Sequence, residues 1–225
     1  MNLEVKNDLL SIIDKVSDEY GPHSNAVLIT KLHLIRSLIS HYENNELINE
    51  LINEVSLHYA RTLPDSLKYR LPSVDGFYIS EFDVENSNDP NDSVKKLIIN
   101  IDSKDKLNSL SSNKWYIYII DQFDRFRIMN VPVSTAELIV KRSYINTSHK
   151  KTSLIHPLLL EYKTDRVKAA GEIGIIKDSH NKIAGALINN KSGHFKPHKS
   201  TLKLVRDYLT KLNVKQDQIY EVEIG

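Results

Sequence analysis

The residues best suited to chemistry lie in two short segments of the C-terminal half. In the first, Gly171 precedes Glu172, a carboxylate that stands at the beginning of a predicted strand. In the second, the polar turn Ser192–His194 offers a hydroxyl, backbone N–H groups and an imidazole, and Lys196 adds a positive charge beside it. A carboxylate, an imidazole and a helix N-terminus that meet at one sheet edge suit a ligand with anionic or ribose groups. We therefore expect the functional site around Glu172 and this turn.

Each of these residues also has a purely structural interpretation. Glu172 would then pair with a basic side chain or with the backbone, as a single glutamate in a strand often does. His194 would tie the turn to the sheet, and Ser192 would only cap the turn. Phe195 and Pro197 are typical of packing and of a helix start. The functional hypothesis therefore depends on the whole group.

A second pair of carboxylates stands near the C-terminus, in Glu221-Val222-Glu223. Two residues that are two positions apart on a strand point to the same face, so both carboxylates would act at one place. The Glu-x-Glu spacing resembles the catalytic loop of arginine-modifying ADP-ribosyltransferases. Alternating charge is also common on exposed edge strands. Glu221 and Glu223 thus compete with Glu172 for the role of catalytic carboxylate.

The elements that must position these residues begin with helices. Apolar residues recur at helical spacing between residues 3 and 61, with a stop at Gly21-Pro22 and a capping Ser24 before the second helix. The near-repeat over 46–54 draws one apolar stripe down a third helix, which favours packing over partner binding. We expect a helical N-terminal segment over residues 1–65.

The remaining residues, 66–225, form the expected catalytic domain. Pro197 and Ser200 introduce a late helix, and Ser134 with Glu137 has capping-box spacing at the start of a short one. A hairpin tip is expected at 178–181, and strands are expected over 77–82, 97–101, 115–120, 158–162, 172–176, 183–188 and 219–224. Because helices come first and strands dominate later, we predict an α+β fold: an N-terminal helical segment packed on a mostly antiparallel β-sheet, with a late C-terminal helix.

Composition narrows the classes of partner. The 30 Lys and Arg residues nearly balance the 29 Asp and Glu residues, which argues against general nucleic-acid binding. The chain has no Cys, so disulfides, thiolate zinc and cysteine nucleophiles are excluded. The N-terminus lacks the layout of a signal peptide, and no apolar run approaches the ~18 residues that span a membrane. We expect a soluble protein with no membrane partner.

Metal binding is not expected either. The polar loop 85–92 carries carboxylates but lacks the glycine and terminal glutamate of an EF-hand loop. His194 and His198 are four residues apart, a spacing that binds zinc on a helix, but Pro197 between them argues against a helix there.

Four motifs carry a family resemblance that covers residues 115 to about 209, roughly two-fifths of the chain. They are Lys114-Trp115, His156, Ala170-Gly171-Glu172 and Ser192-Gly193-His194-Phe195-Lys196-Pro197. This region resembles the domain that follows the IQ motif in plant IQ-motif calmodulin-binding proteins, which is shared with fungal relatives and bacterial effectors. The last motif is the most specific. Pro157-Leu158 stands where the family has Ser-Ser, and Phe195 replaces Tyr; residues 1–61 hold no IQ motif, so calmodulin binding is not carried over.

The resemblance implies a bacterial effector or toxin that ADP-ribosylates a protein, with a link to effectors that modify a threonine of host ubiquitin. Such an enzyme would stay in the bacterial cytoplasm until its delivery into a host cell without a classical signal peptide. Its chemistry needs NAD as a substrate and a carboxylate that stabilises an oxocarbenium-like transition state. Glu172 is the expected carboxylate, and His194 with Ser192 would orient the ribose or the acceptor. The positions expected to hold NAD are His156, Ser192, Gly193 and Lys196.

Two other function classes stay open. One is a non-catalytic module that binds a ligand or protein at the Ser192–Pro197 turn, with Glu172 in a structural role. The other is a metal-independent nuclease toxin that uses His149-Lys150-Lys151, His194 and His198. A serine hydrolase, a P-loop kinase and a Rossmann oxidoreductase are disfavoured, because the chain lacks their motifs.

Overall fold

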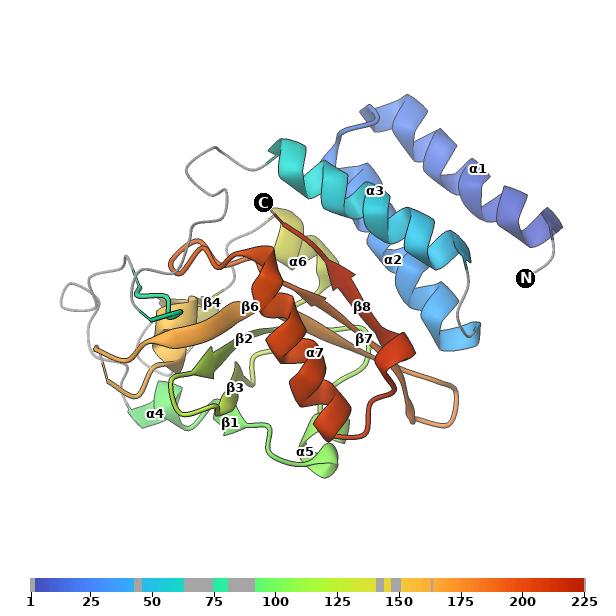
Figure 1. The fold of residues 1–225 in the computed structure, drawn as a ribbon. Helices are drawn as coiled ribbons and strands as arrows, with labels where there is room; N and C mark the ends of the chain where they lie inside the picture. Colours follow the sequence, from blue (N-terminus) through green and yellow to red (C-terminus); the bar gives the residue numbers. More distant parts are fainter. Residues whose placement is uncertain are drawn as a thin grey trace.

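A computed structural model describes residues 3–42, 46–62, 75–80, 92–140, 144–146, 151–162 and 164–224 (Figure 1). The N-terminal part is a layer of three helices: α1 (Leu3–Tyr20), α2 (Asn25–His41) and α3 (Glu46–Thr62). Gly21 ends α1 with a positive φ of 87°, a conformation that costs glycine little. Ser24 caps α2 by accepting a hydrogen bond from Val27 N at 3.4 Å. The three predicted helices are confirmed.

The second part contains one six-stranded sheet with the strand order β1-β3-β2-β6-β7-β8. Only β7 and β8 pair in parallel, and the other neighbours are antiparallel. The strands are β1 (Ile98–Asn100), β2 (Trp115–Asp121), β3 (Phe126–Met129), β6 (Val167–Lys177), β7 (Ile183–Asn189) and β8 (Ile219–Val222). The predicted α+β class with a mostly antiparallel sheet is therefore confirmed.

The connection between β7 and β8 contains the late helix. Parallel neighbours need a crossover, and α7 (Leu202–Lys211) provides it. The shorter elements are α4 (Asp92–Lys95), α5 (Lys104–Asn108), α6 (Thr135–Val140), β4 (Tyr144–Asn146) paired with β5 (Lys151–Ser153), and the 3₁₀ helices η2 (His156–Leu159), η3 (Lys199–Thr201) and η4 (Gln216–Gln218). Within the described part, no helix is both long and apolar enough to cross a membrane.

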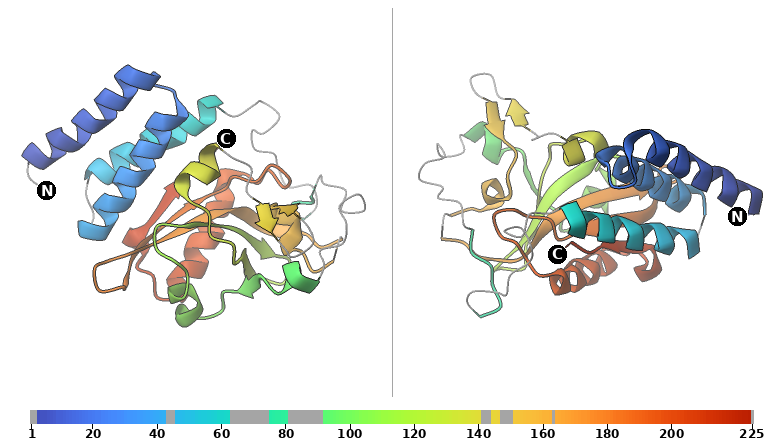
Figure 2. Two further views of the ribbon diagram at one scale, coloured as in Figure 1. Left: turned by 180° about the vertical axis from the view of Figure 1, so that it is seen from behind. Right: turned by 90° about the horizontal axis from the view of Figure 1, so that it is seen from above.

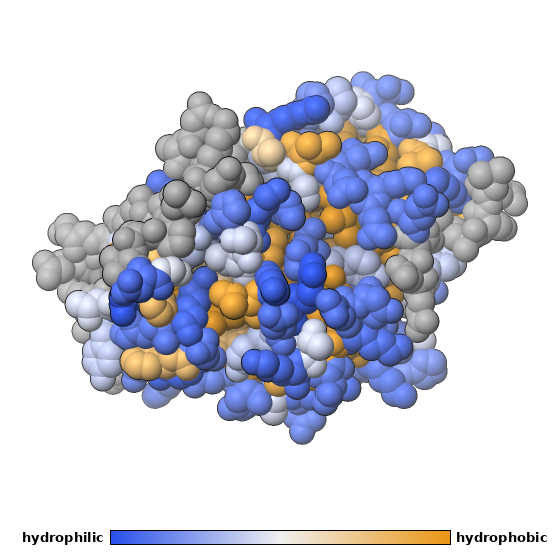
Figure 3. Space-filling view, in the orientation of Figure 1, coloured by the Kyte–Doolittle hydropathy of each residue, from blue (hydrophilic) through white to orange (hydrophobic). Residues whose placement is uncertain are grey.

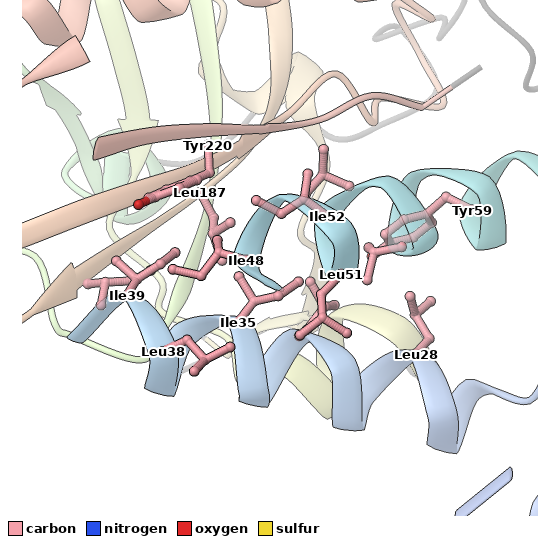
Figure 4. Close-up of a cluster of buried hydrophobic side chains, with 14 of the residues drawn as sticks. Leu28, Ile35, Leu38, Ile39, Ile48, Leu51, Ile52, Tyr59, Leu187 and Tyr220 are labelled. Carbon is pink, nitrogen blue, oxygen red and sulfur yellow. The ribbon is translucent and has the colours of Figure 1, made fainter. Parts of the chain in front are cut away.

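Apolar side chains bury both faces of the sheet. The helices α1–α3 form a layer on one side of the sheet (Figure 2). Ile35 of α2 and Ile48 of α3 meet Leu187 of β7 and Tyr220 of β8 in the cluster beneath this layer (Figure 4). Burial of each such aliphatic side chain contributes about 1.5–3 kcal/mol. The helical segment is thus part of the same packed body as the sheet.

The other face of the sheet packs against α7. Val205 and Leu209 of α7 lie in one cluster with Ile173 and Ile175 of β6. On this side the described surface is mostly hydrophilic, and orange side chains form separate small areas between blue ones (Figure 3). A third cluster continues the helix-covered face toward η2 and includes Ile117, Ile119, Leu158, Leu159, Ala170 and Phe195.

Two of the predicted strands are corrected. Residues 158–162 are not a strand: η2 occupies His156–Leu159, with Pro157 in its first turn. Pro157 has a fixed φ and no N–H for a sheet ladder, and this outweighs the strand-like run of leucines. Of the strand predicted over 77–82, the described residues show only bridge residues at Phe77 and Tyr78, with Tyr78 paired to Val167, and residues 81–82 lie outside the described part.

Other local predictions are confirmed. Ser134 and Glu137 form the capping box, with Ser134 N to Glu137 Oε2 at 2.8 Å and Glu137 N to Ser134 Oγ at 3.2 Å. The hairpin tip closes between β6 and β7, where Asp178 N donates to Lys182 O at 2.8 Å. The short strand β3 was not predicted, and the loop 85–91 lies outside the described residues.

Candidate functional site

Glu172 lies in the middle of β6 rather than at its start, and β6 is an interior strand of the sheet. Its side chain faces the helix-covered side, between Ala170 of one apolar cluster and Ile176 of another, because residues two apart on a strand share a face. A carboxylate in this position must find polar partners, since a buried charge without them is costly.

Asn189 of β7 supplies the first partner. Glu172 N donates to Asn189 Oδ1 at 3.0 Å, and Asn189 Nδ2 donates to Glu172 Oε2 at 2.8 Å. Asn189 is fully buried and Glu172 is 6% exposed. Asn189 Oδ1 also accepts from Lys191 N at 2.9 Å, so one amide joins the strand to the segment that follows it. This reciprocal pair fixes one carboxylate oxygen of Glu172.

Lys191 covers the other carboxylate oxygen more loosely. Its Nζ lies 3.5 Å from Glu172 Oε1 and 3.5 Å from Leu138 O, and its side chain is 29% exposed. The same ammonium lies 5.5 Å from the ring centroid of Tyr59 on α3. Burial raises the pKa of the Tyr59 phenol well above its usual value, and the negative charge of Glu172 raises it further. The carboxylate is thus enclosed by side chains from the helical layer and from the loop after β7.

Gly171 allows a close approach to the backbone, as the sequence predicts. The group that approaches is the backbone of β7 and not a ligand. A Cβ atom at this position would lie 1.9 Å from Asn189 O and 2.9 Å from the Tyr118 hydroxyl oxygen. Tyr118 donates its hydroxyl to the same Asn189 carbonyl at 2.8 Å. No side chain fits there without a shift of the backbone, which explains the glycine.

His156 lies on the other side of this glycine. Its Nε2 is 2.9 Å from Gly171 O and therefore carries the proton, because a carbonyl oxygen only accepts. Burial lowers the pKa of His156 to about 4; the bond to Gly171 opposes this shift, and the charges of His194 and Lys191 add to it. At neutral pH this imidazole is uncharged and holds the backbone beside Glu172.

The turn after β7 is strongly ordered by its own hydrogen bonds. Ser192 Oγ accepts from Phe195 N at 3.3 Å, and Lys196 N donates to Ser192 O at 2.8 Å. Lys196, rather than Gly193, has the positive φ of this turn, at 48°. Ser192 is therefore a capping residue, whatever further role it has. His194 is half-buried and Gly193 is exposed, so these two residues lie nearer the surface.

Asn190 ties this turn to the C-terminus. Its Nδ2 donates to Pro197 O at 2.8 Å and to Ile224 O at 2.7 Å, and its Oδ1 accepts from Ile224 N at 2.8 Å. Phe195 is completely buried, as expected for a packing residue. His198 caps η3 by accepting from Ser200 N at 3.2 Å, so its Nδ1 is engaged locally.

The rival carboxylates lie elsewhere. Glu221 Oε1 is 2.6 Å from Arg206 Nη2 of α7, and Glu223 Oε2 accepts from Lys199 Nζ at 2.7 Å. Arg206 belongs to α7 and Lys199 to η3, which directly precedes α7, and Glu223 lies just beyond the end of β8. Burial raises the pKa of Glu221, and the charge of Arg206 opposes this shift. Because Glu172 faces the helical layer, it cannot form one catalytic pair with either of them.

A cavity of about 350 Å³ adjoins the rival pair. It lies between α3, α7 and the edge strand β8, and its polar lining includes Asn49, Asn53 and Arg206 as well as both glutamates. These carboxylates therefore adjoin open space, whereas the Glu172 side chain is 7% exposed. Among the described residues, no group of three or more His, Asp or Glu side chains is arranged to hold a metal ion.

Sequence reasoning did not single out Asn189 or Tyr59. Asn189 carries a weak signal, because it is a polar residue that directly continues the apolar run 183–188. Tyr59 carries none, since its meeting with Lys191 depends on how α3 docks on the sheet. The structure brings together Glu172, His156 and the segment after β7, whereas His149 and Lys150 lie outside the described residues.

No family model, curated protein or solved structure gives a match to the chain.

Proposed function

We propose that the protein is an NAD-dependent ADP-ribosyltransferase that acts on a protein, with Glu172 as its catalytic carboxylate. The observation that supports this proposal is the convergence of three distant segments on Glu172. Asn189 fixes one carboxylate oxygen at 2.8 Å, Lys191 lies 3.5 Å from the other, and His156 holds the adjoining backbone. Electrostatic stabilisation by a group that is already oriented is the strongest contribution an active site makes to such a reaction.

The two oxygens of Glu172 have different roles in this proposal. Oε2 stays bonded to Asn189 and sets the orientation of the carboxylate. Oε1 faces Lys191, and the distance from its Nζ to Oε1 is a long 3.5 Å. In this proposal the partly exposed Lys191 side chain moves aside for a ligand. Oε1 would then accept a hydrogen bond from a ribose hydroxyl. The negative charge of Glu172 would stabilise the positive charge that develops on the ribose as the bond to nicotinamide breaks.

The other residues position this carboxylate and the substrates. His156 is uncharged at neutral pH and acts through its bond to Gly171, not as a proton donor to the substrate. His194 and Gly193 lie nearer the surface and, with Ser192 and Lys196, would contact the cofactor or orient the acceptor. The family resemblance favours a threonine of host ubiquitin as that acceptor, after delivery of the protein into a host cell.

Labelled NAD tests the proposal. The purified protein is incubated with labelled NAD and either ubiquitin or a cell lysate, and transfer is measured for the parent chain, Glu172→Gln and Glu223→Gln. Glu172→Gln keeps the volume and the bond to Asn189, so we expect loss of label of at least about 100-fold with little loss of folding. Glu223→Gln is the matched control and should transfer normally. Loss in Glu223→Gln with full activity in Glu172→Gln would move the catalytic carboxylate to Glu223, which directly follows β8.

The burial of Glu172 favours a second candidate, a non-catalytic binding module. With 7% of its side chain exposed and bonds to Asn189 on both its backbone and its carboxylate, Glu172 is also suited to a purely structural role. NAD would then neither be consumed nor raise the melting temperature, because a ligand stabilises only a protein that binds it. RNA degradation in the absence of NAD would instead indicate a nuclease.

A further inference from the structure

A cavity of about 640 Å³ opens at the far end of the β6–β7 pair from Glu172. It is enclosed by the end of α2, by α5, by the β6–β7 turn and by residues 213–218 before β8. Figure 1 shows the β6–β7 hairpin reaching away from the sheet below the end of α2. Lys177 at the turn lies five positions along β6 from Glu172, which is about 17 Å along a strand. The cavity has the size of small-molecule sites, about 300–1,000 Å³.

Three lysines from three separate segments line this cavity: Lys104, Lys182 and Lys215. All three are exposed, and none of their ammonium groups takes part in a salt bridge or hydrogen bond with the residues that the structure describes. Asp178 also lines the cavity, and its negative charge offsets one of the three positive charges. Its Oδ1 accepts from His180 N at 2.8 Å and from Lys182 N at 2.9 Å, so this carboxylate is used to close the turn. The rim has an excess of positive charge.

The rest of the lining combines apolar side chains with amides. Ile39, Val214 and Tyr220 are buried side chains that contribute an apolar floor. Amide groups that can donate to a ligand come from Asn108, Asn181 and Asn213. Asn181 and Asn213 both have a positive φ, at 59° and 63°, so the two turns that present them are tightly formed. An apolar floor under a rim of cations and amides matches a ligand with an anionic end and an apolar body.

We propose that this cavity binds a small phosphorylated molecule whose body is apolar or aromatic. Lysine ammonium groups are compact point charges that bind phosphate, and three of them can surround a di- or polyphosphate group. The apolar side chains would contact the body, and the asparagine amides would bond its polar atoms. This site lies at the opposite end of the β6–β7 pairing from Glu172 and does not depend on the proposed transferase activity.

Calorimetric titration with inorganic pyrophosphate and with ADP tests the site. We expect both to bind, ADP about tenfold more tightly because of its apolar body, and both more weakly in 0.5 M salt. Lys182→Ala with Lys215→Ala should weaken binding by about 25- to 100-fold, since each exposed lysine contributes about five- to tenfold to phosphate binding. The matched control is Lys203→Ala, an exposed lysine of α7 that does not line the cavity, and it should bind normally.

Several results would overturn the site. These are absence of binding by both probes, equal affinity for ADP and pyrophosphate, or an equal loss of affinity in Lys203→Ala. Titration can also be followed by the chemical shifts of the backbone amides. If the shifts of Asn181, Lys182 and Asn213 did not change while those of other residues did, the site would be overturned as well. Failure of the transferase proposal is distinguishable, because Glu172→Gln should bind ADP at this cavity as the parent chain does, and the double lysine variant should transfer label from NAD normally.

Discussion

The two ends of the β6–β7 pair hold their charges in opposite ways. At one end, Glu172 is buried and bonded by Asn189, with the ammonium of Lys191 beside it. At the other end, Lys182 projects from the turn without an ion pair among the described residues and lines an open cavity. The difference is that the hydrogen bonds and burial of Glu172 already serve the fold, whereas the exposed ammonium groups around the cavity are open to solvent.

Gly171→Ala should have the largest effect, because it directly disrupts the end of the β6–β7 pair that holds Glu172 and Asn189, which we call the closed end. The new methyl group would lie 1.9 Å from Asn189 O, which belongs to the backbone and cannot move without β7. We expect a loss of more than about 3 kcal/mol in the free energy of unfolding, from overpacking and from the broken Glu172–Asn189 pair. Urea denaturation measures it.

Gly174→Ala is the comparison for that variant. Its nearest neighbour would be Arg36 Nη1 at 2.7 Å, the far end of a flexible side chain. The loss should therefore be clearly smaller than for Gly171→Ala. Equal losses in the two variants would contradict the assignment of Gly171 to a backbone contact.

Acid should weaken the closed end through His156. Its pKa is about 4 in the folded chain and about 6.5 when unfolded, so the unfolded state binds more protons between these values. The stabilisation is complete above pH 6.5 and is lost as the pH falls toward 4, a change of about 3 kcal/mol. Denaturation at several pH values measures it.

His156→Gln should flatten this pH dependence while its amide keeps the bond to Gly171 O. His33 and His58 also have lowered pKa values, mainly because of burial, so part of the slope should persist in the variant. An unchanged slope would show that His156 does not titrate in this range.

Asn189→Leu should lower the free energy of unfolding by about 2 kcal/mol, because Glu172 N and Oε2 lose their partner inside the protein. The double variant with Glu172→Leu removes both polar groups. Its loss should be smaller than the sum of the two single losses, since no buried group is then left without a bond. Additive losses would argue against the reciprocal pair.

Lys182→Ala should have the smallest effect on folding. The side chain is exposed and forms no ion pair in the described part of the chain, so stability should change by less than about 0.5 kcal/mol. The same variant should lose pyrophosphate affinity. A large loss of stability would show that this lysine serves the fold, and the contrast between the two ends would disappear.

Local signals in the sequence predicted the structure correctly where a feature depends only on interactions between residues that are close in the chain. The helix stop at Gly21 and the capping box at Ser134 depend only on neighbours in the chain, and both are present. The strand predicted at 158–162 failed because Pro157 imposes a short 3₁₀ turn within an apolar run that alone resembles a strand.

The candidate site was predictable only in part. The sequence singled out Glu172, Gly171 and His156, and the structure brings these residues together. It did not reveal that β6 begins five residues before Glu172, which places the carboxylate inside the sheet. The partnership with Asn189 depends on the register between β6 and β7, and a slip of one residue would turn either side chain to the opposite face.

Spacing of apolar residues, turn chemistry and charge balance were enough to determine the α+β class, the three N-terminal helices and the late helix, because these follow from contacts within a few residues of one another. Strand order, register and the docking of α3 decided which of the candidate residues lie together. They put Glu172 and Glu221 on opposite faces, enclosed the first, and gathered three distant lysines around one cavity. Such arrangements arise from packing between segments far apart in the chain, which no local pattern encodes.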